Sequence, residues 1–328
     1  MMLWQGGATF AILACYLQSC ASGARYNMQS KLKYRKGKAM KVPFVKMQGL
    51  GNDFIFIEDF DNQIDVSAQA AQHLCDRHFS VGADGVVLVR SSENEDCAAY
   101  MHCINADGTL SELGGNGLRC FAKFLFDRGF VAQNAGEMKI DTPAGPKSVT
   151  YTVDEQGKFE AATVDMGEPV LENDGEVLHL GSAWGAFDFT SVSMGNNPHA
   201  VCCVDDWYSM FSDLFEDGRA SSLDSFALNK VGEFFESHPS FPNKTNVEFV
   251  CAASDGLHMR VYERGCGETL GCGTGSCAAL VAACERGLCG RESDVHLPGG
   301  TLHIQWRDDN HVLMTGSAQE CYSGEVEL

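Results

Sequence analysis

The chain has 328 residues, of which 45% are hydrophobic and 21% are charged. This length predicts about two domains, and the composition excludes a largely disordered chain. With 24 basic and 44 acidic residues, the formal net charge is −20, so we expect no binding to nucleic acid. No apolar run approaches the ~18 residues that a membrane-spanning helix needs, so we expect no insertion into a membrane.

Residues 1–39 differ from the remainder because they contain six basic residues and no acid. They also contain an apolar stretch over residues 8–17. This composition fits an organelle transit peptide better than a secretory signal. The other interpretation is an extension upstream of a start at Met40. In either case we leave residues 1–39 out of the fold, and we expect a cytoplasmic protein unless this segment directs import into an organelle.

The fifteen cysteines are scattered, with no Cys-x-x-Cys pair and no Cys/His set at zinc spacing. A chain of this length does not need disulfides to stabilise its core. We therefore expect most of the thiols to be small buried hydrophobes in a reducing compartment. The sequence also lacks a P-loop and a dinucleotide-binding fingerprint. We predict no metal and no cofactor.

Apolar runs bounded by turn residues predict strands along most of the chain. In chain order they are residues 54–57, 85–89, 148–153, 162–166, 246–250, 257–262, 295–297, 301–306 and 311–316. Two other apolar segments each begin at a Gly-x-Gly turn and end at an acid-Arg-Gly sequence. These segments predict buried helices that are closed by a glycine.

The two helical segments are copies of one pattern. The first contains Gly115 and Gly117, and adding 158 to these numbers gives Gly273 and Gly275 in the second. The closing Arg-Gly sequences obey the same offset. A single Gly-x-Gly is more often a plain turn, but two copies with matching helix ends indicate two α/β domains built on one plan.

A helix that begins at a glycine-rich turn presents free backbone N–H groups and the positive end of its dipole, which together bind a carboxylate. Two such ends facing each other would hold one carboxylate between them. Cys272 directly precedes the second turn, where the same field is expected to lower the pKa of a thiol from about 8.5. A thiolate beside a bound carboxylate can remove the α-proton of an amino acid, and a second acid on the opposite face can return it with inversion.

From Met40 to the C-terminus, the chain resembles the diaminopimelate epimerase family, whose members are cofactor-independent two-base racemases and epimerases. The motifs that carry this resemblance are MQGLGNDF from residue 47, DRHF from 76, GADG from 82, NADG from 105, FP from 241, TNV from 245 and ERGCGETLGCGTG from 263. The last of them is the most specific.

The resemblance implies an α/β (α+β) fold of two pseudo-symmetric domains, each a curved mixed sheet wrapped around a central helix. Residues 40–158 with 315–328 would form the first domain, and residues 159–314 the second. The implied reaction converts LL-diaminopimelate to meso-diaminopimelate, for lysine and peptidoglycan synthesis, without a cofactor. The implied partner is this small amino-acid substrate, and a homodimer is left open.

The resemblance also assigns roles to residues. Cys272 matches one of two catalytic cysteines, and Glu263 and His199 match polar groups beside the reacting carbon. The matches that hold the α-carboxylate at the two helix starts are Gly115, Asn116, Gly273 and Thr274. The matches for the substrate's amino and distal carboxylate groups are Asn52, Asn105, Asn197, Asn246 and Arg264. The chain carries an extra Asn at 196–197, and we align Asn197 with the family's substrate-binding residue.

One departure concerns the family's other catalytic cysteine, because its position is occupied by Gly114 in this chain. The repeat offset gives the same position, since 272 − 158 = 114. A glycine offers no acid or base, so turnover is expected to be impaired. The chain is then a variant whose thiol was replaced, a homologue that works from one face or with another second base, or a ligand-binding protein without turnover. A racemase for another amino acid, such as histidine, is a further alternative. Such an enzyme would have other residues in place of those matched to the substrate's distal amino and carboxylate groups.

Overall fold

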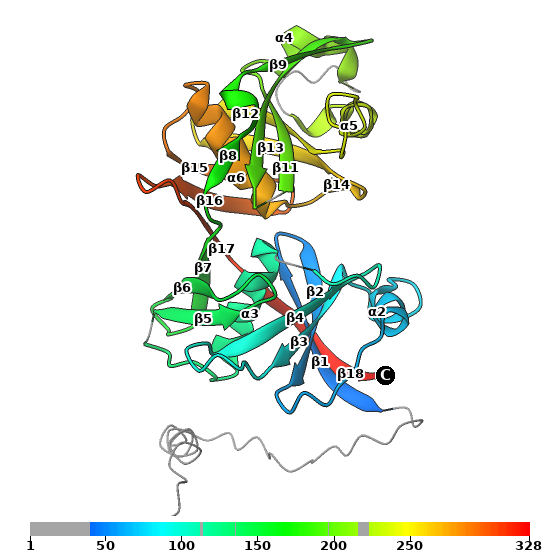
Figure 1. Ribbon diagram of the computed structural model, residues 1–328, viewed down its shortest axis with the longest axis vertical. Helices are drawn as coiled ribbons and strands as arrows, with labels where there is room; N and C mark the ends of the chain where they lie inside the picture. The colour runs from blue at the N-terminus through cyan, green and yellow to red at the C-terminus, as the bar shows by residue number, and fades with distance from the viewer. Residues whose placement is uncertain (1–39, 112–113, 135, 196, 216–222) are drawn as a thin grey trace, which may run out of the picture. The chain divides into compact units, whose positions relative to one another are not determined.

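The computed structural model describes residues 40–111, 114–134, 136–195, 197–215 and 223–328 (Figure 1). The predictions for residues 1–39 and for Asn196 therefore lie outside the described residues. The helices are α2 (Ala68–Cys75), α3 (Gly115–Asp127), α4 (Trp207–Phe211), α5 (Leu228–Glu236) and α6 (Gly273–Glu285). Short 3₁₀ segments are η1 (Glu172–Gly175), η2 (Ser212–Leu214) and η3 (Leu223–Ser225).

The strands form two series, and consecutive strands within each series pair with each other. The first is β18 (Gln319–Glu327), β1 (Lys41–Gly49), β2 (Asn52–Asp59), β3 (Gly85–Arg90), β4 (Ala99–Asn105), β5 (Glu137–Asp141), β6 (Lys147–Val153) and β7 (Phe159–Asp165). The second is β8 (Pro169–Leu171), β10 (Gly185–Met194), β11 (Asn197–Cys203), β12 (Asn246–Ala253), β13 (Gly256–Glu263), β15 (Glu292–Leu297), β16 (Gly300–Trp306) and β17 (Val312–Gly316). Strands β9 (Leu178–Ser182) and β14 (Gly267–Thr269) pair beside the second series, on β10 and β13.

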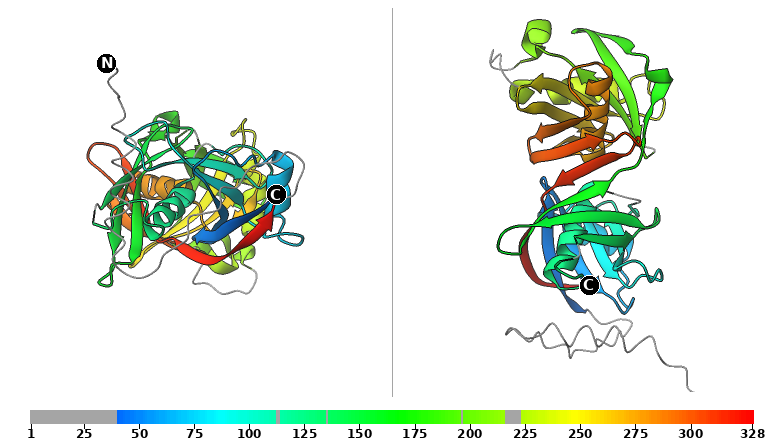
Figure 2. Two further views of the ribbon diagram at one scale, coloured as in Figure 1. Left: turned by 90° about the horizontal axis from the view of Figure 1, so that it is seen from below. Right: turned by 90° about the vertical axis from the view of Figure 1, so that its left-hand side faces the viewer.

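The two series have the same topology. In the first, successive pairs are antiparallel, antiparallel, parallel, antiparallel, parallel, antiparallel and antiparallel. The second series repeats this succession from β8 to β17. The series join where β7 pairs with β17, visible as adjacent green and red strands in the right-hand view of Figure 2. After β7 the chain enters the second series as β8, and after β17 it returns to the first series as β18. Strands β8 and β18 are therefore equivalent.

Each series curves around one helix. Helix α3 packs on β1, β2, β6 and β7, and α6 packs on β10 to β13 and on β15 to β17. Nearly every residue of α6 from Gly273 to Ala283 is buried, which is the pattern of a helix enclosed on all sides. The prediction of curved mixed sheets around two central helices is confirmed, whereas the domain boundaries at 158/159 and 314/315 stay a prediction.

Three apolar clusters hold these layers together. The largest includes both central helices and the strands around them, with Phe56 and Phe124 stacked at 5.4 Å between ring centres. An aromatic cluster around Phe187, Trp207 and Phe249 lies beneath α4 and α5. Burying a side chain of this size stabilises the fold by about 1.5–3 kcal/mol. A smaller cluster lies beneath α2.

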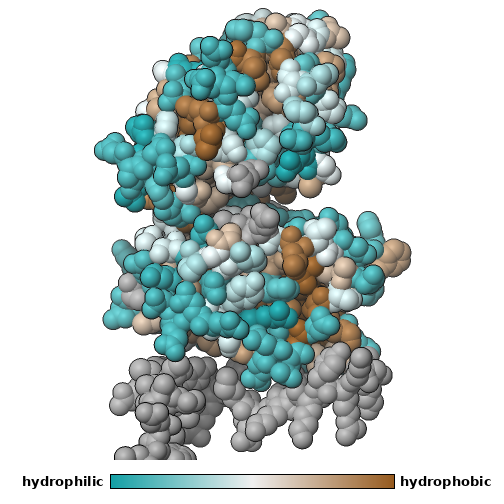
Figure 3. All heavy atoms as spheres, viewed as in Figure 1, coloured by the Kyte–Doolittle hydropathy of each residue, from teal (hydrophilic) through white to brown (hydrophobic). Residues whose placement is uncertain are grey.

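The surface seen in Figure 3 is mostly hydrophilic, with separate apolar patches on both series. Exposed large apolar side chains include Phe79, Leu110 and Met210. In the described part of the chain, no helix is long and apolar enough to span a membrane.

Candidate active site at two helix N-termini

The two glycine-rich helix starts have the same backbone conformation. Helix α3 follows Gly114 (φ −128°, ψ 120°), and α6 follows Cys272 (φ −120°, ψ 111°). Their ends match as well, because the cap residues Arg128 and Arg286 have φ −85° and −84°. Positions 114 and 272 are therefore equivalent in space as well as in sequence.

The two helix starts lie next to each other. Asn116 Nδ2, on α3, is 3.4 Å from the carbonyl oxygen of Gly271, just before α6. The side chain of Met314 packs against both starts: a Cβ at Gly115 would overlap its Cε, and a Cβ at Gly273 would lie 2.9 Å from its Sδ. Both positions need glycine because the Met314 side chain packs directly against the backbone at each of them and leaves no room for a Cβ. The positive ends of two helix dipoles therefore meet here.

The Cys272 thiol is buried among polar groups of the second helix start. Its Sγ donates to Glu263 Oε2 at 3.3 Å and accepts from the N–H of Gly275 at 3.4 Å. Thr274 Oγ1 lies 3.6 Å from the same sulfur. The other oxygen of Glu263 accepts a hydrogen bond from the Thr269 hydroxyl. The structure thus brings the predicted residues Cys272, Glu263 and Thr274 into contact.

The expectation that the helix field lowers the pKa of Cys272 is wrong. Burial raises this pKa well above its usual value, because the thiolate would lose its hydration. The negative charges of Glu263 and Glu248 raise it further. Hydrogen bonds from Thr274 and Gly275 lower the pKa, but they are smaller effects. Cys272 is therefore a protonated thiol at neutral pH, ready to act as an acid.

This protonation state predicts how Cys272 reacts with iodoacetamide. We expect slow modification at neutral pH and a rising rate in alkaline solution, because thiolate forms only as the pH passes the raised pKa. Glu263→Gln removes a neighbouring negative charge, so the profile should move to lower pH. Mass spectrometry of the α6 peptide measures the rate. Glu285→Gln, at the exposed end of the same helix, should leave the profile unchanged, and rapid wild-type modification at pH 7 would contradict the assignment.

Position 114 offers open space where the equivalent position holds a thiol. A Cβ on Gly114 would meet no atom of the described residues within 4 Å, its chain neighbours aside. The backbone there is extended, which any residue adopts. In the described part of the chain no side chain caps the first N–H groups of α3, in contrast to the bond that Gly275 donates to Cys272.

Four of the predicted residues form one connected group beside the start of α6. Asn197 Nδ2 donates to Thr274 Oγ1 at 3.0 Å, and Asn197 Oδ1 accepts from Asn246 Nδ2 at 3.1 Å. Asn246 Oδ1 in turn accepts the backbone N–H of Arg264 at 2.8 Å. The Arg264 guanidinium is exposed and contacts only the Asn243 carbonyl, at 3.4 Å, among its hydrogen-bond partners in the described residues. Its charge is therefore available to a ligand.

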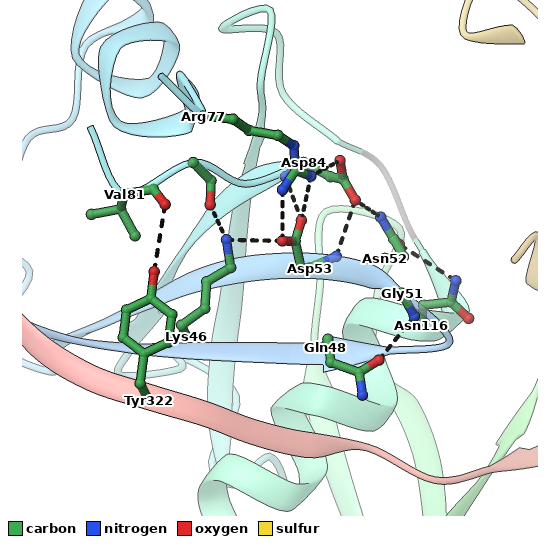
Figure 4. A network of polar contacts seen from close by, with 11 residues as sticks. Lys46, Gln48, Gly51, Asn52, Asp53, Arg77, Val81, Asp84, Asn116 and Tyr322 are labelled. Atoms are coloured by element: carbon green, nitrogen blue, oxygen red, sulfur yellow. Dashed lines mark hydrogen bonds and ion pairs between the residues drawn. The ribbon is translucent and has the colours of Figure 1, made fainter. Parts of the chain in front are cut away.

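Asn52 and Asn116 lie at the other helix start, as Figure 4 shows. Asn116 Nδ2 is 3.4 Å from Asn52 Oδ1, and Asn52 Nδ2 donates to Asp84 Oδ2 at 2.7 Å. Arg77 joins Asp84 to Asp53 with ion pairs of 2.8 and 2.7 Å. These motif residues hold the turn between β1 and β2 that carries Asn52.

Asn105 is less closely connected. It ends β4 opposite Gly85, and its side chain donates to Thr109 Oγ1 at 3.0 Å. This hydrogen bond does not join it to any other predicted site residue, so its position at the end of β4 is what links it to the Asp84 segment.

His199 is paired with a buried glutamate that the sequence motifs do not include. His199 Nδ1 lies 2.6 Å from Glu248 Oε1, and both side chains are fully buried. His199 Nε2 and Glu248 Oε2 have no hydrogen-bond partner among the described residues. Burial raises the pKa of Glu248, and His199 lowers it. A carboxylate inside an apolar strand is rare enough that the sequence could have indicated this pair.

Arg119 is a second residue that the motifs do not include. It is fully buried in α3, and its Nη2 donates to Asn116 Oδ1 at 2.9 Å. Burial lowers its pKa to about 10, and the groups that oppose this shift are the thiols of Cys120 and Cys277 rather than a carboxylate. The guanidinium therefore keeps its charge at neutral pH and adds to the positive potential at the helix starts. A basic residue in the first half of an apolar helix, with no acidic residue one turn away, was the available signal.

Comparisons with known proteins agree with this geometry. The model of the family described as diaminopimelate epimerase matches residues 44–172 and 190–321. A diaminopimelate epimerase of Leptospira biflexa is 40% identical over 301 residues, covering 88% of this chain and all of that protein. One from Methanococcus maripaludis is 39% identical over 299 residues, covering 88% of this chain and 100% of that protein.

Solved structures show the same fold at lower identity. A PhzF-family phenazine biosynthesis protein from Bacillus anthracis has a TM-score of 0.65 and 17% identity, covering 88% of this chain and 99% of that one. A hydroxyproline epimerase from Agrobacterium vitis, solved with bound trans-4-hydroxy-L-proline, has a TM-score of 0.64 and 15% identity, covering 88% and 93%. With identities near 40% along the whole length of its relatives, the chain belongs to the diaminopimelate epimerase family of amino-acid epimerases.

Proposed function

We propose that this chain binds diaminopimelate and exchanges the proton on its α-carbon through Cys272, and that glycine at 114 impairs conversion of the LL form to the meso form. The observation that carries the proposal is the equivalence of positions 114 and 272. Each position directly precedes the first residue of a central helix, with the same backbone conformation. Position 272 carries a thiol, whereas position 114 has no side chain and leaves space for one among the described residues.

The substrate's α-carboxylate would lie against the free N–H groups at the starts of α3 and α6. Arg119 strengthens this anion site from behind, through its bond to Asn116. The distal ammonium and carboxylate groups would be bound by Arg264 and by the amides of Asn197 and Asn246. A guanidinium suits a carboxylate because it donates two parallel hydrogen bonds.

Inversion at the α-carbon requires a base on one face and an acid on the other, whereas exchange with retention needs a base on one face only. When the α-proton leaves, the electron pair on the carbon delocalises into the carboxylate, where the helix N–H groups stabilise the added charge. Cys272 would donate the returning proton from its face, since its thiol is protonated. For exchange on that face alone, Cys272 must first pass its proton to Glu263, 3.3 Å away, and then take the α-proton as a thiolate.

The same features favour a second candidate function. Without a group at 114, and with Cys272 protonated at rest, the chain could hold its ligand without turning it over. The protein would then be a binding protein on an epimerase fold. This candidate differs from the first in predicting tight binding with no exchange.

Exchange of deuterium into LL- and meso-diaminopimelate in D₂O, followed by NMR with chiral analysis of the products, tests the proposal. We expect deuterium at the α-carbon with retained configuration and slow inversion. Fast inversion would mean that another group replaces the missing thiol. Binding measured by calorimetry without exchange would favour the second candidate, and absence of binding would overturn both.

We also propose that the protein works in a reducing compartment such as the cytoplasm. All cysteines in the described part of the chain are free thiols, including the adjacent pair Cys202 and Cys203. Disulfides form and persist in oxidising compartments, so a free set of this size supports the proposal.

A further inference from the structure

We propose that Asp255, His258 and His296 bind a divalent transition-metal cation of the zinc type. One donor atom from each of the three side chains lies within 4.8 Å of the others. These residues take no part in the candidate active site. His258 and Glu263 are five residues apart along β13, which corresponds to about 17 Å at ~3.3 Å per residue.

The sheet itself brings the three residues together. His258 and His296 are register partners on the parallel strands β13 and β15, so their side chains project from the same face. Their ring centres are 4.8 Å apart. Asp255 lies in the turn between β12 and β13, with Oδ1 at 2.9 Å from His258 Nε2 and Oδ2 at 3.9 Å from His296 Nε2. The carboxylate therefore lies between the two rings.

Two imidazoles and one carboxylate are a donor set for Zn²⁺, Cu²⁺ or Ni²⁺, and a poor one for Mg²⁺ or Ca²⁺, which prefer oxygen. Zinc bonds of about 2.0–2.1 Å in a tetrahedral site place donors roughly 3.3 Å apart. The separations of 2.9 Å and 3.9 Å, measured to the two oxygens of Asp255, lie on either side of this value. Because the three donor atoms lie within 4.8 Å of one another, rotations of these partly exposed side chains would draw them together around a cation. Water would complete the coordination.

A neighbouring residue is placed to orient one of the rings. His296 Nδ1 lies 2.9 Å from the hydroxyl oxygen of Thr301, its register partner on β16. Donation of Nδ1–H to this oxygen leaves Nε2 unprotonated and free to bind metal, which is how ligating histidines are commonly held. Nε2 now lies 3.0 Å from the Asp255 carbonyl, to which it can only donate, so the cation would displace this contact as the ring proton moves to Nδ1.

The three side chains are at least partly exposed to solvent, and they lie where β13 pairs briefly with β15. The side chains of Asp255, His258 and His296 are 61%, 43% and 27% exposed, so a cation can enter without unfolding. Strands β13 and β15 share only two register pairs, Leu257 with Val295 and His258 with His296. A bound cation would cross-link this pairing to the adjacent hairpin, so it should raise the melting temperature.

The test uses the full chain, stripped with EDTA and titrated with Zn²⁺ by calorimetry under reducing conditions. Single variants His258→Ala and His296→Ala are compared with the wild type. The control is His303→Ala, because His303 is 44% exposed and contacts two carboxylates on the same sheet. It does not belong to the group of three donors that lie within 4.8 Å of one another in the described part of the chain. All variants keep every cysteine, so binding by thiols is a constant background.

We expect one zinc site above this background that weakens at least tenfold in each of the two histidine variants and is unchanged in the control. The ring resonances of His258 and His296 should shift together in NMR spectra, and the zinc-dependent rise in melting temperature should be lost with the site. Equal binding by all four proteins, or an equal loss in His303→Ala, would overturn the proposal. Melting temperatures measured without metal show whether each variant is folded.

Discussion

The variant Gly114→Cys is expected to convert LL-diaminopimelate to the meso form at least a hundredfold faster than the wild type. A positioned acid or base contributes about 10²–10⁴-fold to a proton transfer, and the variant supplies the one that the second face lacks. The new thiol would lie at the start of α3, where position 114 is only half-buried. The burial that raises the pKa of Cys272 would be weaker there, so the free N–H groups would favour a thiolate. With Cys272 protonated, the two thiols would be a matched base and acid.

The structure accommodates this substitution without strain. The Cβ meets no atom within 4 Å among the residues that the structure describes, its chain neighbours aside, and the φ of −128° suits any residue. By the repeat, Gly117 would donate its N–H to the new sulfur as Gly275 does to Cys272.

Chiral analysis of the product against time measures the effect of the substitution. Gly114→Ser is the matched control: it fills the same space with a hydroxyl, which does not ionise at neutral pH, and should give little increase. If Gly114→Cys binds the substrate with wild-type affinity but shows no faster inversion, the missing thiol is not what limits this chain.

The variant Cys272→Ser should lose α-proton exchange by a factor of about 10²–10⁴, because serine cannot replace a thiol as the acid and base at this position. The fold should survive. Cys272 is the N-cap of α6, and serine is among the preferred N-cap residues. The helix start also keeps the hydrogen bond from the Ser276 hydroxyl to the carbonyl of residue 272 and the one from Asn197 to Thr274.

The exchange rate in D₂O measures this loss, with circular dichroism and substrate affinity as checks on the fold. The control is Cys321→Ser, which removes an exposed thiol from β18 and should leave exchange unchanged. Exchange that persists in Cys272→Ser would assign the chemistry to another group, and His199 with its buried partner Glu248 would then be examined first.

The sequence predicted the central part of the fold because local signals and a repeat agreed there. Glycines at both ends of α3 and α6 mark the helix bounds, and all nine predicted strands are present. Strands such as β18 were missed because their residues are exposed and polar, and their pairing with a distant segment decides their conformation. The predicted strands do not reveal this pairing.

The candidate site was predicted only in part. The motifs located Cys272, Glu263 and the amide group around Asn246. The pKa of Cys272 was predicted in the wrong direction because the sequence shows the helix start but neither the burial of the thiol nor the two carboxylates beside it. Glu248 reaches this place from the interior of β12, where a carboxylate in an apolar strand was a signal that the motifs did not use.

The pairing of the first and last strands has a consequence for the connectivity of the chain. Strand β18 pairs along β1, and the backbones of Met40 and Leu328 are joined by hydrogen bonds of 3.2 and 2.8 Å. The ends of the described unit are therefore neighbours. A short linker would close this unit into a ring, and a cut in the exposed turn at residues 154–157 would reopen it as a circular permutant with every strand pairing retained.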